Sequence, residues 1–353
     1  MVFMEWVQYT LTPFASWGAM AYTQVDNHQL IQSVSLFGMA GLGFLIYLCN
    51  MVVAQSLVEG KIPMKRLMVP VAMILVFLFY GAIRYDYFKS QGRDSIKVAA
   101  VGTDSMAGGL PLPSDAQRHE DMRTLLERTR AAAMSGPEMI VWNEAALVIL
   151  PEEERIWKDT LSALANEVGA SLVASYVVVL EGESFQFENK YVLYASDGSL
   201  ISEYYKEEPV PGEPAIVKPN DIGFSTINGA KVSGAICYDF DFPYMGRRLN
   251  QADIVGLPAS DWRGIDPIHT KMAAFRAIEQ GNSIVRSTRW GLSAAINPMG
   301  EFTSQMSDFD QNDKIMIGYV PAKSIFTVYR VIGDLFVFVC LGFAIYVMIW
   351  GKD

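Results

Sequence analysis

Three long stretches of this 353-residue chain are almost free of charged residues, and they limit what the chain can fold into. Residues 27–56 and 67–83 contain no Asp, Glu, Lys or Arg, and residues 331–350 contain only Asp334. Each stretch approaches or exceeds the roughly 20 apolar residues that a helix needs to cross about 30 Å of hydrocarbon. The predicted transmembrane helices cover residues 30–55, 67–84 and 330–351. Pro70 is expected in the first turn of the second helix, where its missing N–H does little harm.

The short connection between the first two predicted helices, residues 56–66, sets the expected orientation. It carries three basic residues against a single glutamate, and short basic loops stay in the cytoplasm. Three crossings then place residues 1–29 and 85–329 outside. We expect a bacterial inner (plasma) membrane protein whose large domain lies on the periplasmic or outer face. Residues 1–29 are expected to form an extracytoplasmic, interfacial segment; a membrane crossing by residues 6–25 is the alternative, and it would change the orientation.

Residues 85–329 have the composition of an ordinary globular domain. Short apolar runs rich in β-branched residues recur there, which is typical of strands buried on both faces. Helical patterns at 114–135 and 269–280 separate some of them, and Asp197-Gly198 predicts a tight hairpin. Such an order predicts an α/β fold in layers. The expected strands lie at 96–101, 138–142, 171–180, 190–195, 232–238, 253–257, 291–297 and 314–320.

Three expected strands end in residues that could form a catalytic site. Cys237 follows the apolar run at 232–236, Glu144 follows Met139–Trp142, and Lys206 follows the hairpin strand that ends at Tyr205. The other two cysteines lie in predicted membrane helices, so Cys237 has no disulfide partner in its domain. A buried structural cysteine and solvated surface charges are the alternative interpretation of each residue alone.

The three residue types suit acyl transfer through a thioester. A thiolate is the nucleophile, and a carboxylate with a raised pKa can take its proton and later protonate a leaving group. The tetrahedral oxyanion needs fixed positive charge or hydrogen-bond donors, which a lysine and a backbone N–H supply.

Several motifs resemble the nitrilase superfamily, whose members use a Glu-Lys-Cys triad in an αββα sandwich. More narrowly, the chain is similar to its membrane-bound branch, the apolipoprotein N-acyltransferases, over nearly its whole length. The motifs are IVWNEA at 140–145, the run from Asn189 through Tyr205-Lys206 to Gly212-Glu213, ICYD at 236–239, SDW at 260–262 and the stretch 269–288. The family has several more membrane helices before the position of Trp17, and this chain begins almost there.

The resemblance implies a role for each matching residue. It assigns the general base to Glu144, the catalytic lysine to Lys206 and the nucleophile to Cys237. It also implies supporting or substrate-binding roles for a second set: Tyr238, Asp239, Glu213 and Trp262. The implied fold is a nitrilase-like αββα sandwich flanked by transmembrane helices.

The implied activity is transfer of a fatty acyl chain from phospholipid, through a cysteine thioester, to the N-terminal amine of a lipoprotein. The expected partners are a phospholipid donor, a lipoprotein acceptor and the membrane, and the chain works either alone or with a separate helical membrane protein. No cofactor is expected. No metal is expected either, because the three histidines are scattered along the chain. The net charge of −10 gives no footprint for nucleic acid.

Two other functions fit part of the sequence. A membrane-tethered amidase of the nitrilase type would act on a small C–N substrate without needing lipid. A non-catalytic membrane partner would share the scaffold, but retention of all three triad residue types argues against it. Trp262, Tyr244 and Trp290 are candidates to line an acyl-chain cleft. His269 could pair with Cys237, although starting its own helix is the favoured role.

Overall fold

Two β-sheets packed face to face form the centre of the computed structural model, which describes residues 1–104, 111–180 and 185–351. The first sheet has the order β13-β1-β2-β4-β5-β6, with β3 paired to β4, and the second has the order β12-β11-β10-β9-β8-β7. The first comprises β1 (Ser95–Val101), β2 (Met139–Trp142), β3 (Val148–Ile149), β4 (Ser171–Leu180), β5 (Gln186–Tyr194), β6 (Leu200–Tyr205) and β13 (Ile315–Pro321). The second comprises β7 (Ser225–Ile227), β8 (Ala230–Gly234), β9 (Ile254–Ser260), β10 (Ser283–Arg289), β11 (Leu292–Ile296) and β12 (Phe302–Ser307).

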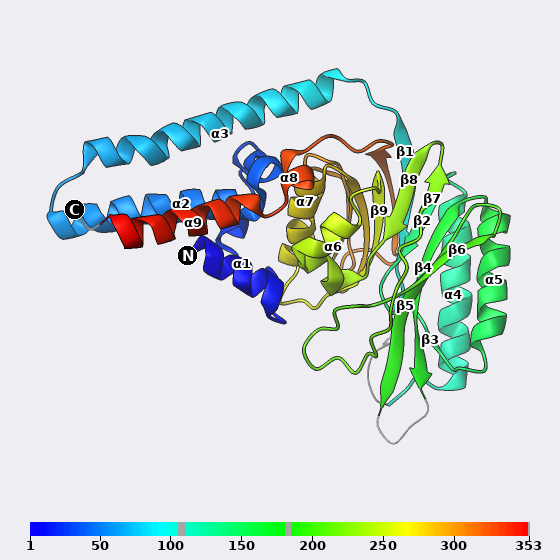
Figure 1. Ribbon diagram of the computed structural model, residues 1–353. Helices are drawn as coiled ribbons and strands as arrows, with labels where there is room; N and C mark the ends of the chain where they lie inside the picture. The colour runs from blue at the N-terminus through cyan, green and yellow to red at the C-terminus, as the bar shows by residue number, and fades with distance from the viewer. Residues whose placement is uncertain (105–110, 181–184, 352–353) are drawn as a thin grey trace.

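Helices cover both outer faces of this sandwich (Figure 1). Helices α4 (Asp115–Ala133) and α5 (Glu154–Val168) lie on the first sheet, and α6 (Pro243–Arg248) and α7 (Ile268–Gln280) lie on the second. The alternation along β1 shows why: Val98 and Ala100 join the core between the sheets, whereas Ala99 and Val101 join the core under α4 and α5. Because side chains of a strand alternate between faces, a fully apolar strand needs a partner on each side. The predicted layered α/β fold is confirmed.

The remaining helices project from the α6–α7 side of the sandwich (Figure 1). They are α1 (Val2–Leu11), α2 (Val34–Glu59), α3 (Met64–Ser90), the short α8 (Val328–Ile332) and α9 (Leu335–Trp350), with 3₁₀ turns η1 (Met20–Gln24) and η2 (Leu30–Ser33) before α2. The extended helix 30–59 and α3 are long and apolar enough to cross a membrane. Helix α9 has 16 residues, a length of about 24 Å, which is shorter than the hydrocarbon core.

Three details differ from the sequence-based expectation. Helix α3 begins at Met64, so Pro70 lies in its second turn instead of the first. Gly38 interrupts α2 with a φ of +63°, and the Met39 N–H after the break donates to the buried Glu279 carboxylate at 3.0 Å. Strand β8 ends at Gly234, and Cys237 begins a separate 3₁₀ turn, η3 (Cys237–Asp241).

Helix α7 joins the sandwich to the helices that precede it in the chain. Its residues Met272, Phe275 and Ile278 form one apolar cluster with Tyr22 and other residues of the first third of the chain. The rings of Tyr22 and Phe275 meet edge to face with centroids 4.9 Å apart. The apolar face of α7 is therefore buried against the N-terminal segment, and the two parts of the chain share one core.

Candidate active site

Glu144 and Lys206 form a buried ion pair at the ends of two strands of the first sheet. Glu144 follows β2 and Lys206 follows β6, and their side chains are 4% and 2% exposed. Lys206 Nζ lies 2.8 Å from Glu144 Oε1 and 2.7 Å from Glu213 Oε2. A buried charge needs such partners, because removing it from water costs several kcal/mol.

An amide holds the two carboxylates of this cluster in place. Asn189 Nδ2, on β5, donates to Glu144 Oε1 at 2.8 Å and to Glu213 Oε1 at 2.9 Å. The Val210 N–H donates to the other oxygen of Glu213 at 3.0 Å. The cluster Glu144–Lys206–Glu213–Asn189 is thus a fixed polar group at one edge of the first sheet.

Cys237 faces this cluster from the second sheet. Its φ of +45° lies in the left-handed region, which is uncommon outside glycine and is typical of strained functional positions. Its thiol donates to the Ser260 carbonyl oxygen at 3.7 Å, and the nearby Glu144 carboxylate raises the pKa of this thiol. The structure therefore brings together the three residues that the sequence singled out: Glu144, Lys206 and Cys237.

Asp239 fastens the Cys237 turn to the loop after Lys206. One of its oxygens accepts hydrogen bonds from the Glu207 and Glu208 N–H groups at 3.0 and 2.7 Å. The other accepts from the Tyr204 hydroxyl at 2.9 Å. Asp239 is fully buried, so this residue positions the backbone and does not face a cavity.

The pKa directions describe a protonated thiol beside an ionised carboxylate. Burial by itself raises the pKa of Glu144, but attraction and hydrogen bonds from Lys206 outweigh it, so the net pKa is lowered. The expected raised pKa of this carboxylate is therefore wrong. Burial and the nearby Glu144 carboxylate raise the pKa of Cys237 well above its usual value. In this resting state the proton lies on the sulfur and Glu144 is ionised, as a general base must be before it accepts a proton.

An apolar cavity of about 490 Å³ opens onto Cys237, and we call it the Cys237 cavity. It is lined by Phe14, Trp17, Val210, Pro211, Cys237, Tyr238, Ser260, Trp262, Ile265 and His269. The N-terminal segment contributes one wall, since the Tyr238 hydroxyl donates to the Pro13 carbonyl at 2.7 Å and Trp17 Nε1 donates to Asp241 Oδ2 at 2.8 Å. Pro13–Trp17 is therefore bonded directly to the turn that carries the thiol.

A second buried network lies on the other side of Cys237. His269 places one ring nitrogen 2.6 Å from Asp261 Oδ1 and the other 3.0 Å from Asp241 Oδ2. Arg286 Nη2 lies 2.8 Å from the same Asp261 oxygen. Burial lowers the pKa of His269, but the two carboxylates outweigh it and raise this pKa to about 9. The imidazole is therefore positively charged at neutral pH.

This network bears on two sequence-based predictions. The donor atoms of Cys237, Asp261 and His269 lie within 4.8 Å of one another, a spacing that could hold a metal ion. Both ring nitrogens already face carboxylates, and Asp261 also pairs with Arg286. We therefore interpret the group as an ion-pair network. His269 bonds to the aspartates, so the considered Cys237–His269 dyad is not formed.

Of the three aromatic residues that were candidates to line an acyl-chain cleft, one lines the Cys237 cavity. Trp262 lines the Cys237 cavity, whereas Tyr244 and Trp290 are absent from its described lining. Tyr244 instead donates to Glu208 Oε1 at 2.7 Å. Sequence reasoning missed Phe14 and Trp17, because no local pattern shows that residues more than 200 positions before Cys237 reach its cavity. Asp261 and His269 lie in motifs that resemble the family. The sequence alone does not show that the two side chains are buried together as a pair.

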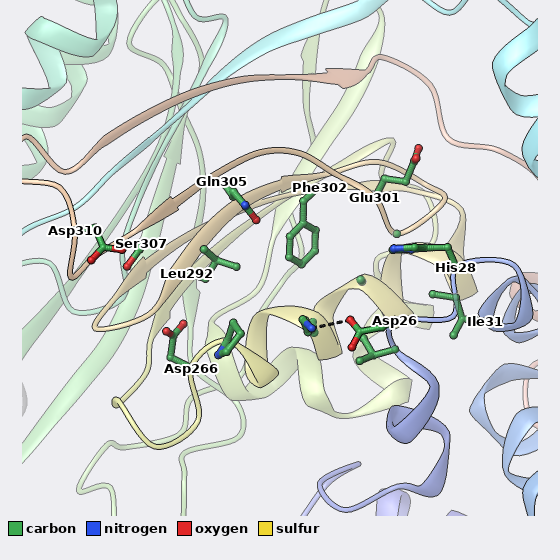
Figure 2. A pocket seen from close by; sticks show the side chains of 15 residues that line it. Asp26, His28, Ile31, Asp266, Leu292, Glu301, Phe302, Gln305, Ser307 and Asp310 are labelled. Atoms are coloured by element: carbon green, nitrogen blue, oxygen red, sulfur yellow. Dashed lines mark hydrogen bonds and ion pairs between the residues drawn. The ribbon is translucent and has the colours of Figure 1, made fainter.

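The largest described cavity, about 700 Å³, lies elsewhere. We call it the acidic cavity, because its lining includes Asp26, Asp266, Glu301 and Asp310. Figure 2 shows these carboxylates around one space. Asp26 forms an ion pair with Lys271 at 2.7 Å. None of Glu144, Lys206 and Cys237 lines it.

Comparison with protein families yields two matches. Residues 97–326 match the carbon-nitrogen hydrolase family model. Residues 1–52 match the N-terminal domain of apolipoprotein N-acyltransferase.

Curated relatives match most of the chain at low identity. The apolipoprotein N-acyltransferase of Rickettsia bellii (strain RML369-C) is 26% identical over 351 residues, covering 91% of this chain and 68% of the relative. The apolipoprotein N-acyltransferase of Geobacter metallireducens is 24% identical over 363 residues, covering 92% of this chain and 68% of the relative.

Solved structures share the fold of the sandwich. An amidase from Nesterenkonia sp. superposes with a TM-score of 0.51 at 16% identity, covering 65% of this chain and 91% of that one. A carbon-nitrogen hydrolase from Helicobacter pylori G27 superposes with a TM-score of 0.53 at 17% identity, covering 65% and 90%. These likenesses support the predicted nitrilase-like sandwich.

Proposed function

The chain belongs to the carbon-nitrogen hydrolase family, and on that premise we propose that it is a membrane-bound lipoprotein N-acyltransferase. It moves a fatty acyl chain from phospholipid, through a thioester on Cys237, to the N-terminal amine of a lipoprotein. The observation that carries the proposal is the apolar Cys237 cavity, which opens onto the thiol that lies near the Glu144–Lys206 pair and has a wall from the N-terminal segment. Relatives named apolipoprotein N-acyltransferase cover 91% of the chain and add support.

The first half-reaction loads the enzyme. Glu144 takes the proton of the Cys237 thiol, and the sulfur attacks the ester carbonyl carbon of the phospholipid. Lys206, 2.8 Å from Glu144, and the Tyr238 backbone N–H stabilise the oxyanion. The C–S bond forms, the C–O bond breaks, and Glu144 returns the proton to the departing lysophospholipid oxygen.

The second half-reaction transfers the acyl group from Cys237 to the lipoprotein. The lipoprotein amine attacks the thioester carbon while Glu144 takes a proton from the nitrogen. The C–N bond forms, the C–S bond breaks, and the proton passes from Glu144 to the sulfur, which restores the thiol. Glu213 and Asn189 hold Lys206 and Glu144 in register throughout, and Asp239 holds the Cys237 turn.

The membrane location places the cavity where both substrates are found. Helices 30–59 and α3 are candidate membrane spans, and the connection between them is basic. We propose that this connection is cytoplasmic and that the sandwich lies on the periplasmic or outer face. Sharing one bilayer replaces a three-dimensional search for the two substrates.

We also propose that a separate helical membrane protein packs against α3. This helix buries only Pro70, Phe77 and Gly81 among its residues, and much of the rest of its length is apolar. Photo-crosslinking from Phe79, whose side chain is 70% exposed, tests this contact in native membranes. A crosslink to lipid alone contradicts it.

Intact-protein mass spectrometry tests the proposed activity. Incubation with phospholipid in micelles should add one acyl mass that hydroxylamine removes, and a lipopeptide with a free N-terminal amine should discharge it. The Cys237→Ala variant should show no adduct, and Cys49→Ala, a change within α2, should behave as the wild type. A folded wild-type protein that gains no acyl group contradicts the proposal.

The same assay separates the amidase alternative, which rests only on the fold shared with amidases. An amidase would release ammonia or amine from small amides in the absence of lipid. Amide hydrolysis that depends on Cys237, with no phospholipid-derived adduct, would assign the chain to that class.

A further inference from the structure

A second cavity, of about 530 Å³, adjoins the Cys237 cavity. Trp262 lines both, and its side chain is 55% exposed at their junction. We call this second space the Arg263 cavity. Its lining differs from that of the apolar Cys237 cavity, because it combines aromatic rings with charged side chains.

Two carboxylates and two cations line the Arg263 cavity, and Arg128, paired with one of these carboxylates, adds a third positive charge beside it. Its two carboxylates are already paired: Asp104 with Arg128 at 2.9 Å, and Asp308 with Lys314 at 2.9 Å. Arg263 lines the cavity and forms no salt bridge within 4.0 Å among the described residues, although its charge acts to lower the pKa of the Asp266 carboxyl. In a chain whose net charge is −10, this local excess is a departure that favours an anionic ligand.

Aromatic rings hold the arginine side chains in a form suited to anion binding. The Arg263 guanidinium lies over the Phe309 ring, 4.0 Å from its centroid, and the Arg289 guanidinium lies over Trp290 at 4.5 Å. Stacking uses the face of the Arg263 guanidinium plane and leaves the N–H groups along its edge for other contacts. Two nitrogens of Arg289, Nε and Nη2, instead donate to the Ser260 hydroxyl. A planar fork of N–H donors matches the oxygens of phosphate.

The Arg263 cavity is connected to the reactive sulfur through one residue. The carbonyl oxygen of Ser260 lies 3.7 Å from Cys237 Sγ. The hydroxyl of the same serine accepts a hydrogen bond from Arg289 Nη2 at 3.0 Å. Burial lowers the pKa of Arg289, while Glu144, Asp308 and Cys237 oppose that shift. The Arg289 guanidinium therefore connects Trp290, over which it stacks, to the serine whose carbonyl oxygen faces the sulfur.

We propose that the Arg263 cavity binds the phosphodiester of the acyl donor while the ester carbonyl lies at Cys237. The acyl chain occupies the apolar Cys237 cavity, and Trp262 separates chain from headgroup. Only the glycerol backbone lies between ester and phosphate in a phospholipid, which matches the two adjoining cavities. This inference rests on the proposed acyl-transfer function, because it assigns a place to the donor's headgroup.

A binding experiment tests the site without any chemistry. Full-length Cys237→Ala protein is titrated with phosphatidylglycerol in neutral detergent micelles, and separately with diacylglycerol carrying the same acyl chains. Adding Arg263→Gln should weaken phosphatidylglycerol binding about tenfold and leave diacylglycerol binding unchanged. Arg155→Gln, at an exposed position on α5, is the matched control and should change neither.

Inorganic phosphate distinguishes the source of the anion. Competition with phosphatidylglycerol that disappears in Arg263→Gln means that the site also accepts free phosphate. An Arg263-dependent preference without such competition means that the phosphate must be attached to lipid. Either result supports an anion site.

Two results overturn the inference. Arg263→Gln could bind both lipids as its parent does, or it could lose affinity for both lipids equally, which would indicate a packing role. The acylation assay reports separately on the proposed function: wild-type protein that accepts no acyl group from either lipid contradicts acyl transfer. The binding comparison in Cys237→Ala protein still decides the phosphate site in that case.

Discussion

The Cys237 cavity and the acidic cavity lie against the same helix, α7, and differ in how their charged groups are held. His269 of α7 faces the first and Lys271 faces the second. The acidic cavity is the larger, about 700 Å³ against 490 Å³. Its ion pair is exposed, with Asp26 82% accessible, whereas Lys206 beside Cys237 is 2% accessible. Size does not identify the reactive site here; buried charge beside a nucleophile does.

The largest expected contrast is between the two lysines. Lys206→Met should lower kcat/KM by about 10³-fold or more and lower the free energy of unfolding by about 3–5 kcal/mol, because two buried carboxylates lose their cation. Lys271→Met breaks an exposed pair with Asp26 and should cost under about 1 kcal/mol. Single-turnover acylation and denaturant unfolding measure both. Equal losses in the two variants would break the comparison.

Substitutions of His269 and His28 should differ in their effect on how the unfolding free energy depends on pH. The pKa of His269 in the folded chain is about 9 against an ordinary 6.5, so its stabilising contribution is complete below pH 6.5. That contribution is lost as the pH rises through 9, up to about 3 kcal/mol in all. His269→Gln should remove this decline in unfolding free energy between pH 6.5 and 9.

His28 is the matched control, because it is an exposed histidine in the lining of the acidic cavity. His28→Gln should leave the pH profile of stability as it is in the wild type. A decline that persists unchanged in His269→Gln would mean that another group titrates.

The smallest contrast concerns the aromatic walls. Trp17→Phe keeps a ring in the Cys237 cavity but removes the 2.8 Å hydrogen bond from Nε1 to Asp241. A loss of about 1 kcal/mol, or roughly fivefold in kcat/KM, is expected. Phe302→Leu in the acidic cavity should leave acylation unchanged. If the two changes have the same effect on kcat/KM, Trp17 has no specific role.

The pattern of the sequence predicted most strands of the sandwich but missed β3, β7, β10 and β12, of which β10 lies in the interior of the second sheet. β4 matches its predicted range of 171–180 because its side chains are apolar on both faces. β12 was missed because its side chains alternate in exposure and carry Ser, Thr and Gln, which resemble a loop. The end of β8 was misplaced at Cys237, because backbone conformation at η3 is set by Asp239 and not by apolar pattern.

The residues of the candidate site were predictable where a short sequence motif contains the reactive side chain. Glu144, Lys206 and Cys237 each end or follow an apolar run, and the structure brings them together. The pKa direction of Glu144 was not predictable, because it depends on a lysine 62 positions away. Trp17 and Asp241 were not predictable either, since only tertiary contact joins them.

The Pro13–Trp17 segment has a practical consequence for dissecting the protein. Ser16 Oγ donates to the Asp241 carbonyl at 2.7 Å, and Tyr238 reaches back to Pro13. A fragment cut after α3 would keep Glu144, Lys206 and Cys237, yet it would lack one wall of the cavity and an anchor of the thiol's turn. The sandwich and the first 20 residues should therefore be exchanged between proteins, or expressed, only as one unit.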